Sequence, residues 1–117
     1  MPTPRSNFTK HTSRLYNSRV VVTRVVSNLG RGTVETVYDG LPCLIQPLTG
    51  QALTTALGIA SEARYGLYCG AEFASKAVDI HAGDIITDQT GKAYSVPTPS
   101  FPAGGGHHVE VLLGDKL

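Results

Sequence analysis

The sequence predicts a mainly β fold, a small antiparallel β-barrel or sandwich with one long loop or short-helix insertion and an extended N-terminal arm. Its composition favours strands and turns, because it has thirteen glycines, seven prolines, many valines and threonines, and no tryptophan. The length of 117 residues suits one domain with a modest core. The longest apolar runs are about five residues, far below the roughly 20 that span a bilayer, and no signal peptide is evident. We therefore expect a soluble protein made in the cytosol.

Charge is distributed unevenly along the chain. Residues 1–34 hold six basic side chains and no acidic one, whereas residues 35–117 hold four basic and nine acidic ones. The opening 18 residues have too few large apolar side chains to fold alone, so we predict an extended basic arm over residues 1–18 and a single barrel domain over residues 19–117. The arm would bind nucleic acid, or the acidic face of another copy or another protein, through Arg5, Lys10, Arg14 and Arg19. A solvated tail without a partner is the alternative.

Two long strands are predicted after the arm. RVVVTRVVSN at 19–28 is rich in β-branched residues, and the spacing of Arg19 and Arg24 places them on opposite faces. The glycines of NLGRG permit a turn, and TVETVYDGLPCLIQPL at 33–48 is the second strand. Its Asp-Gly pair before Leu-Pro predicts a bulge or kink, since proline cannot donate to a ladder.

TGQALTTALGIASEA at 49–63 departs from the β pattern. Its alanines and leucines recur at helical spacing, but Gly58 and the short length argue against a helix of more than two turns. We therefore predict a loop with a short helix over residues 47–63, projecting between two strands.

The next predicted strand, RYGLYCGAEF at 64–73, contains the second of two cysteines. Cys69 and Cys43, which lies in the strand before it, belong to no CxxC or CxxH pair and cannot build a disulfide framework. We expect two free thiols packed as small hydrophobic side chains.

VDIHAGDIITDQTGKAYSV at 78–96 combines turn-forming residues with several acids. Ala-Gly-Asp reverses the chain, so we expect Asp84 to accept hydrogen bonds from turn amides, and QTGK has the composition of a second hairpin loop. The predicted structural turn residues are Gly83, Asp84 and Gly91. A closing strand is predicted in HHVEVLLG from residue 107, where apolar residues alternate. Six strands in all, joined mostly by Gly- or Pro-marked turns, indicate the barrel or sandwich.

The same region holds the residue types of a metal or acid/base site. The candidates are Asp79, His81, Asp84, Asp88, His107 and His108. Asp79 and His81 point the same way in an extended strand. Asp84 and Asp88, however, are expected to bond within their own turns. His107 and His108 are adjacent, so in a strand their side chains face opposite sides of the sheet. No GxSxG, HExxH, P-loop or dinucleotide motif is present. We expect a protein that is not an enzyme, with no catalytic residue, metal or cofactor. A metal-dependent enzyme using Asp79, His81 and a distant histidine is the alternative.

Sequence-specific recognition of nucleic acid is not indicated. It would require a helix with clustered Arg and Lys, or exposed aromatic residues on a basic sheet, and the body of this chain is acidic. Electrostatic binding through the arm remains, so a small β-barrel that binds nucleic acid non-specifically is an alternative function.

The order of these motifs resembles a known family. VYDGLPCLIQPL, the insertion, YGLYCGAE, DIHAGDIITDQTGKAYSV and the closing HHVEVLLG are similar in order and spacing to the small head-closure or head-completion proteins of tailed bacteriophages, also called stoppers or head-tail connector proteins. Their pattern pairs an Ile-x-x-Gly-Asp-x-Ile-type hairpin, here beginning at Ile80, with a Tyr-x-Val strand, here Tyr94 to Val96. The resemblance extends from about residue 34 to 113.

The resemblance implies a structural function in the virion neck. Such proteins are small β-barrels that form rings, typically of six copies, beneath the portal and its adaptor ring, where they close the DNA-filled head and present the tail attachment surface. The implied partners are other copies of the chain, the portal or adaptor ring, tail proteins and packaged DNA without sequence specificity, but no membrane. Assembly would occur in the host cytoplasm. A tail-completion or terminator protein of the same connector is an alternative.

In some members of this family a long loop points into the central channel. The segment that matches it in position is 47–63, with uncharged polar candidates at Thr49, Gln51, Thr54 and Thr55. The basic arm would suit docking onto a neighbouring ring.

Overall fold

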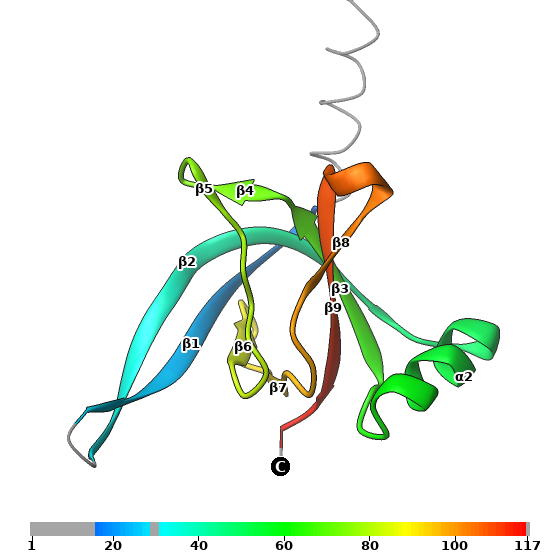
Figure 1. Cartoon of the computed structure of the whole chain (residues 1–117), viewed down its shortest axis with the longest axis horizontal. Helices are drawn as coiled ribbons and strands as arrows, with labels where there is room; N and C mark the ends of the chain where they lie inside the picture. The colour runs from blue at the N-terminus through cyan, green and yellow to red at the C-terminus, as the bar shows by residue number, and fades with distance from the viewer. Residues whose placement is uncertain (1–15, 29–30, 117) are drawn as a thin grey trace, which may run out of the picture.

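The computed structural model describes residues 16–28 and 31–116, which form a closed antiparallel β-barrel (Figure 1). Six strands close it in the order β3-β2-β1-β6-β7-β9, because β9 pairs with β3 as well as with β7. The predicted mainly β fold, a small antiparallel barrel with one short-helix insertion, is confirmed. Nearly all of the predicted arm lies outside the described residues.

A long hairpin of β1, Ser18–Asn28, and β2, Arg31–Pro47, begins in the barrel and extends beyond it (Figure 1). β1 pairs with β2 along its whole length, but its pairing with β6 ends at Thr23. The register shifts twice between β1 and β2, and Gly40 is the extra residue at the first shift, so the bulge predicted from Asp-Gly is confirmed. Bulges increase the twist of a strand, which lets β2 serve both the barrel and the projecting ribbon.

The remaining strands are shorter. Three complete the barrel wall with β9: β3, Tyr65–Gly70, β6, Ile85–Asp88, and β7, Ala93–Ser95. β9 spans His108–Asp115. Its first residues pair with β3 on one side and with β8, Phe101–Ala103, on the other. β4, Glu72–Phe73, and β5, Lys76–Ala77, form a separate small hairpin, and a 3-10 turn covers Gly104–Gly106. The described residues thus form nine strands rather than the six predicted, since three short strands lie outside the closed ring.

Alternate residues of the wall strands fill the barrel. Val109, Val111 and Leu113 point inward from β9, as their spacing predicts, and Leu67 and Ile86 meet them from β3 and β6. The core also holds Val20, Val22, Leu41, Cys43, Cys69, Val78, Ile80, Tyr94 and Val96. Apolar burial on this scale is what stabilises a domain of this size.

The two cysteines are free thiols in this core. Cys43 and Cys69 are cross-strand partners on β2 and β3, and neither side chain is exposed. Burial raises the pKa of each thiol to about 12, so both remain protonated at neutral pH. The expectation of two free, buried thiols is confirmed.

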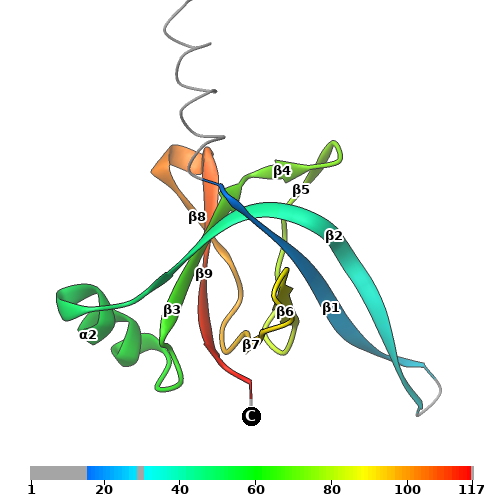
Figure 2. The ribbon, with the colours of Figure 1, turned by 180° about the vertical axis from the view of Figure 1, so that it is seen from behind.

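The helix α2, Gly50–Ile59, lies outside the barrel at the end opposite the β1–β2 hairpin, as both views show (Figure 1, Figure 2). Its ten residues make nearly three turns, longer than the two turns expected. An isolated helix of this length is marginal, and burial of Ala56 and Ala60 against Leu112 of β9 stabilises it. Within the described residues, no helix has the length and apolar character needed to cross a membrane.

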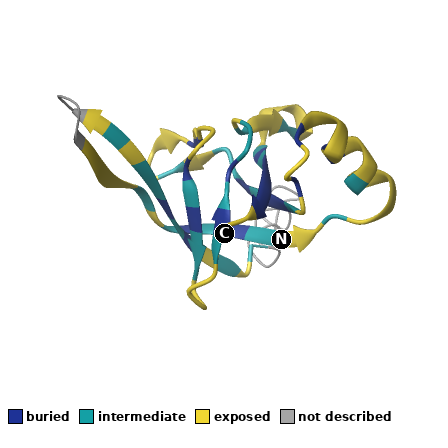
Figure 3. Cartoon of the chain, turned by 90° about the horizontal axis from the view of Figure 1, so that it is seen from below, coloured by how far each residue is buried: buried dark blue, intermediate teal, exposed yellow. Residues whose placement is uncertain are grey.

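Exposure follows the same division between the barrel and its projections. The buried residues lie mostly on the barrel strands, whereas the outer half of the hairpin and most of α2 are exposed (Figure 3). The molecule therefore has a compact centre and two lightly packed elements at the ends of its long axis.

Residues 78–81 differ from the prediction of an extended strand that opens a hairpin. They form a loop, and its backbone is bonded to two separate segments: the Val78 N–H donates to Ala71 O, the Ser100 N–H donates to Ile80 O, and the Ile80 N–H donates to Ser100 Oγ. Because these partners come from two different segments, no continuous ladder forms at this point. The Ile-x-x-Gly-Asp turn therefore joins a fixed loop to β6 instead of joining two paired strands.

Candidate functional site

A polar network lies where the β1–β2 hairpin leaves the barrel. Arg24 continues the inward-facing row of Val20 and Val22, and it meets Asp84, whose exposed fraction is 1%. The Arg24 Nε donates to Asp84 Oδ1 and Nη2 donates to Oδ2, both at 2.8 Å, which is a bidentate ion pair. The hydrogen bonds to Asp84 raise the pKa of Arg24 above its ordinary value, so the guanidinium stays charged at neutral pH. Arg19 lies on the opposite face of β1, as predicted.

The turn before β6 uses the same carboxylate. The His81 N–H donates to Asp84 Oδ2 at 2.9 Å, which confirms the predicted bond to a turn amide. Gly83 has φ +90°, and Gly91 in the following hairpin has φ +91°, a region that favours glycine. The predicted turn roles of Gly83, Asp84 and Gly91 therefore agree with the geometry, while the Arg24 partner was not predicted.

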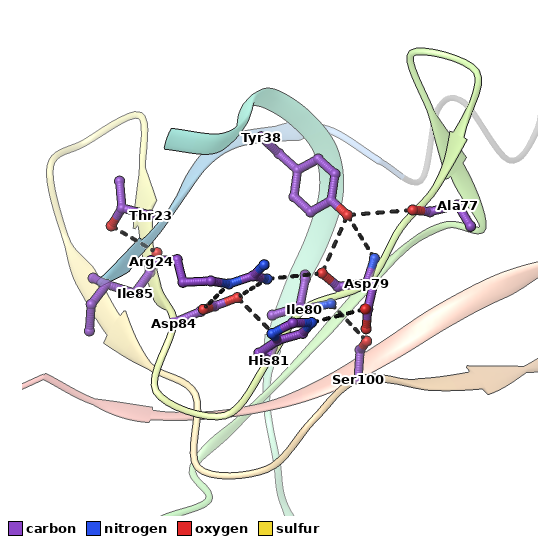
Figure 4. Close-up of polar contacts among 10 residues, drawn as sticks. All are labelled: Thr23, Arg24, Tyr38, Ala77, Asp79, Ile80, His81, Asp84, Ile85 and Ser100. Atoms are coloured by element: carbon purple, nitrogen blue, oxygen red, sulfur yellow. Dashed lines mark hydrogen bonds and ion pairs between the residues drawn. The ribbon is translucent and has the colours of Figure 1, made fainter. Parts of the chain in front are cut away.

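Two strands of the hairpin hold the neighbouring loop (Figure 4). The Asp79 N–H donates to Tyr38 Oη at 2.7 Å, and Tyr38 Oη is 3.3 Å from Asp79 O, to which it donates. The Arg24 Nη2 also donates to Asp79 O at 3.2 Å. Arg24 on β1 and Tyr38 on β2 thus both bond to the backbone of Asp79. These hydrogen bonds fix the loop against the base of the hairpin.

Asp79 and His81 form an exposed pair beside this network. The His81 Nε2 lies 2.9 Å from Asp79 Oδ2, with side-chain exposures of 51% and 72%, so the two side chains point the same way as predicted. In the part of the chain that the structure describes, no three His, Cys, Asp or Glu side chains are grouped so that they could hold a metal ion. The structure therefore does not bring His107 or His108 into such a group with this pair.

Asp88 closes the second predicted turn. Its Oδ1 accepts hydrogen bonds from the Thr90 N–H, the Thr90 Oγ1 and the Lys92 N–H, and the Gly91 N–H donates to Asp88 O. Burial alone would raise the pKa of Asp88, but these hydrogen bonds outweigh it and hold the pKa below its ordinary value. The turn therefore favours the ionised carboxylate.

The predicted partner-binding residues of the arm are only partly described. Arg5, Lys10 and Arg14 lie outside the described residues. Arg19 is exposed at the start of β1, and its Nη1 donates to the carbonyl oxygens of Tyr16 and Ser18. This is a local backbone contact that leaves the guanidinium on the surface.

The predicted channel-loop residues all lie on or next to α2. Thr49 is the N-cap residue without a side-chain cap bond, and Thr54 Oγ1 donates to Gly50 O. All four side chains are exposed: Thr49, Gln51, Thr54 and Thr55. The helix thus presents uncharged side chains to solvent, these polar ones together with the apolar Leu57 and Ile59.

An apolar groove, which we call the α2 groove, runs between this helix and strands β3, β8 and β9. Its volume is about 390 Å³. Ten residues line it: Leu48, Gln51, Ala52, Thr55, Ala56, Ile59, Tyr68, Phe101, Glu110 and Leu112. Burial, and to a lesser extent the charge of Glu110, raise the pKa of the Tyr68 hydroxyl. No sequence pattern marks Tyr68, Phe101 or Glu110 as residues of a groove, because they are brought together from three separate strands.

The fold and these sites define a small closed antiparallel barrel with a projecting hairpin and a projecting helix. Protein SF1141 from Shigella flexneri 2a, known from its solution structure, is similar to this chain at a TM-score of 0.59 with 12% sequence identity. The similarity covers 86% of this chain and 92% of that one, and at this identity it shows a shared fold alone. No protein-family model and no curated protein matches the chain.

Proposed function

We propose that this chain is a structural protein of a tailed-phage virion. It forms a ring at the head-tail connector, where it closes the DNA-filled head and provides the surface for tail attachment. The sequence motifs between about residue 34 and 113 support this proposal by their resemblance to head-closure proteins. The observation that carries it is a small closed barrel with two lightly packed elements, the β1–β2 hairpin and α2, at opposite ends.

A ring accounts for elements that a monomer leaves poorly covered. A two-stranded ribbon is marginally stable alone, and its unpaired strand edges invite contacts with another chain. In a ring each copy covers such surfaces on its neighbours, and association stabilises the folded barrel through mass action. The network around Arg24 and Asp84 supports the same function, because it fixes the base of the ribbon.

The proposed partners are other copies of this chain, in a hexamer, the portal or adaptor ring, the tail proteins and the packaged DNA. The exposed, uncharged side chains of α2 suit a segment that approaches symmetry mates and DNA without a fixed charge. Binding of DNA in a channel would then show no sequence specificity, since no base-reading group is required.

Electron microscopy of the purified protein, alone and mixed with the portal complex encoded in the same genome, tests the proposal. We expect rings stacked on the narrow end of the portal complex. A protein that ignores the portal, remains monomeric and binds bare DNA with a steep dependence on salt would instead be a non-specific nucleic-acid-binding module.

Removal of residues 1–17 tests the docking role of the arm. The shortened protein should bind its partner ring more weakly, and the binding should depend less on salt, because the removed segment contains basic and no acidic residues. Lys76→Gln, which removes an exposed positive charge from β5, serves as the control and should bind like the unaltered protein. Unchanged affinity and salt dependence after the deletion would exclude the arm from the contact.

A further inference from the structure

The joint between β7 and β9, which we call the seam, is the shortest of the six joints that close the described barrel. It consists of two residue pairs, Tyr94 with Asp115 and Ser95 with Gly114. The other joints range from three residue pairs between β6 and β7 to eleven between β1 and β2. Because paired strands supply the backbone hydrogen bonds that hold a barrel closed, the seam has the least backbone support.

The sequence after β7 prevents a longer seam. Pro97 and Pro99 follow β7 closely, and proline has no backbone N–H to donate to β9. The ladder along β9 resumes only with β8, in a different register. Five residues, 96–100, separate β7 from β8, whereas their partners on β9 are separated by three residues, 111–113. The two pairs of the seam therefore stand apart from the rest of the ladder.

Side chains span the seam where the ladder is short. The Lys92 Nζ, just before β7, donates to Tyr65 Oη of β3 at 3.0 Å, and Tyr65 Oη donates to Asp115 Oδ1 of β9 at 3.0 Å. The Lys92 Nζ also lies 3.9 Å from Asp115 Oδ1, and 4.6 and 4.9 Å from the ring centres of Tyr65 and Tyr94. We call these four residues the clasp, and its ammonium group joins β7 to the strands on the other side of the seam.

The contacts of the clasp are individually weak. The side chains of Lys92 and Asp115 are 46% and 53% exposed. Ion pairs and cation–π contacts at such exposure contribute little each, and salt screens the charges. The clasp therefore adds to the seam but does not make it as strong as a long ladder.

Both sides of the seam keep other partners when they separate. β9 is paired with β3, and the Arg64 N–H donates to Leu113 O near the end of β9. The β6–β7 hairpin is paired with β1, and the Arg19 N–H donates to Gln89 Oε1 in its turn. The hydrogen bonds of Asp88 hold that turn together, so the hairpin can move as a unit.

We propose that the barrel opens at the seam by a local motion, and that the clasp holds it closed. In the open state the β6–β7 hairpin stays paired with β1 but leaves β9, and Tyr94 leaves the core. The inference does not depend on the proposed function, because it concerns the barrel of a single chain. It assigns the weakest closure of the fold to one named joint.

Native-state hydrogen exchange, followed residue by residue by NMR in low concentrations of urea, tests the proposal. The references are the amides of Leu67 and Val22, because β3 and β1 each have a paired strand on both sides. The amides that bond across the seam should have opening constants at least about tenfold larger than these references. Their opening constants should also depend little on urea, since a local opening exposes little surface.

Lys92→Met removes the ammonium group and keeps an apolar stem, so it tests the clasp. It should raise the opening constant of the seam amides about three- to tenfold, because these contacts are lost on opening. The references should rise by the same factor, since global unfolding loses the clasp too. Lys92→Arg, which keeps the cation, and Lys76→Met, which removes an exposed charge from β5, should exchange like the unaltered protein.

Cys69→Ala is the control at a joint that stays closed. It removes a buried sulfur between β2 and β3, so it should raise the opening constants of the references about fivefold and leave those of the seam amides unchanged. Circular dichroism confirms that all four variants are folded.

Three results would overturn the proposal. Seam amides with the opening constant and urea dependence of Leu67 and Val22 would show that the barrel opens only by global unfolding. A rise in the references of Lys92→Met without a rise at the seam would show that the clasp survives the opening. An equal rise at the seam and in the references of Cys69→Ala would show that the opening involves the whole barrel.

Discussion

Replacement of Arg24 by methionine should destabilise the barrel strongly. Arg24→Met keeps most of the apolar stem but removes the guanidinium that donates twice to Asp84. The Asp84 carboxylate, with an exposed fraction of 1%, would keep the His81 N–H as its remaining described donor. A buried carboxylate that loses its cation is among the costly changes in a protein interior.

The magnitude follows from the burial of the two partners. Removal of one member of a buried ion pair costs about 3–5 kcal/mol. The side chain of Arg24 is 25% exposed, so water can enter the vacated space and solvate part of the carboxylate. We therefore expect a loss near the lower end, about 3 kcal/mol, which is a large share of the roughly 5–15 kcal/mol that stabilise a typical domain.

Urea unfolding at pH 7, followed by circular dichroism, measures this loss. Arg19→Met is the matched control, because Arg19 lies on the same strand, is exposed and donates only to nearby carbonyl oxygens; it should change stability by less than about 0.5 kcal/mol. In the double variant Arg24→Met/Asp84→Asn, the amide oxygen still accepts from the His81 N–H and carries no charge. That variant should therefore be more stable than Arg24→Met alone, by about 1–2 kcal/mol.

The reasoning would be refuted by one result in particular. If Arg24→Met and Arg19→Met unfold at the same urea concentration with the same slope, the Arg24–Asp84 pair does not anchor the hairpin. A double variant that is no better than Arg24→Met would show that the unpaired charge is not the source of the loss.

Three further predictions follow from the core and the second turn. Cys43 and Cys69, with thiol pKa values of about 12, should not react with a thiol reagent at pH 8 in the folded protein and should react fully in 6 M guanidinium; fast reaction of the folded protein would contradict their burial. Asp88→Ala should lower the free energy of unfolding by about 1–2 kcal/mol at pH 7. Because the folded pKa of Asp88 lies below the ordinary 3.8, this loss should shrink as the pH falls below about 4. A loss that does not depend on pH would show that the ionised carboxylate is not its source. Gly91→Ala should lower the free energy of unfolding by about 1–2 kcal/mol, because Gly91 has φ +91°. Gly58→Ala, in open space on α2, should raise it by up to about 1 kcal/mol. Equal shifts of the two variants in thermal unfolding would contradict the assigned conformations.

The barrel was predictable from local patterns. β-branched runs, glycine and proline at the turns, and alternation in β9 locate most of the wall strands, because these signals depend on neighbouring residues alone. The bulge at Gly40 and the turn at Gly83 were predictable for the same reason, since each depends on a short local motif.

The features that the sequence did not reveal depend on contacts between distant segments. Arg24 meets Asp84 across 60 residues, and Ser100 holds Ile80 across 20, so neither pair leaves a local signal. One clue was present for Arg24, because it shares the inward spacing of Val20 and Val22, and an arginine on that side requires a buried partner.

The helix shows a different limit of sequence reasoning. Propensity and Gly58 argue for two turns at most, and both considerations apply to a helix in water. In the structure Ala56 and Ala60 pack against Leu112, a residue on the outer side of β9. Burial at that contact offsets the weak propensity and extends the helix, and no local rule places Leu112 under it.

The position of Arg24 connects the stability of the barrel with the proposed assembly. It lies one residue beyond Thr23, the last residue of β1 that pairs with β6, and one residue before Val25, which is exposed on the part of the hairpin beyond the barrel. The bonds from Arg24 to Asp84 and to Asp79 O therefore fix the direction in which the ribbon leaves the barrel. A ribbon held at its base loses less conformational entropy on docking than a free one, so the buried ion pair would favour association without belonging to the interface. Two well-packed apolar residues in place of the whole pair could give the barrel similar stability, so fixing the ribbon for association is a role that the ion pair would serve and an apolar pair would not.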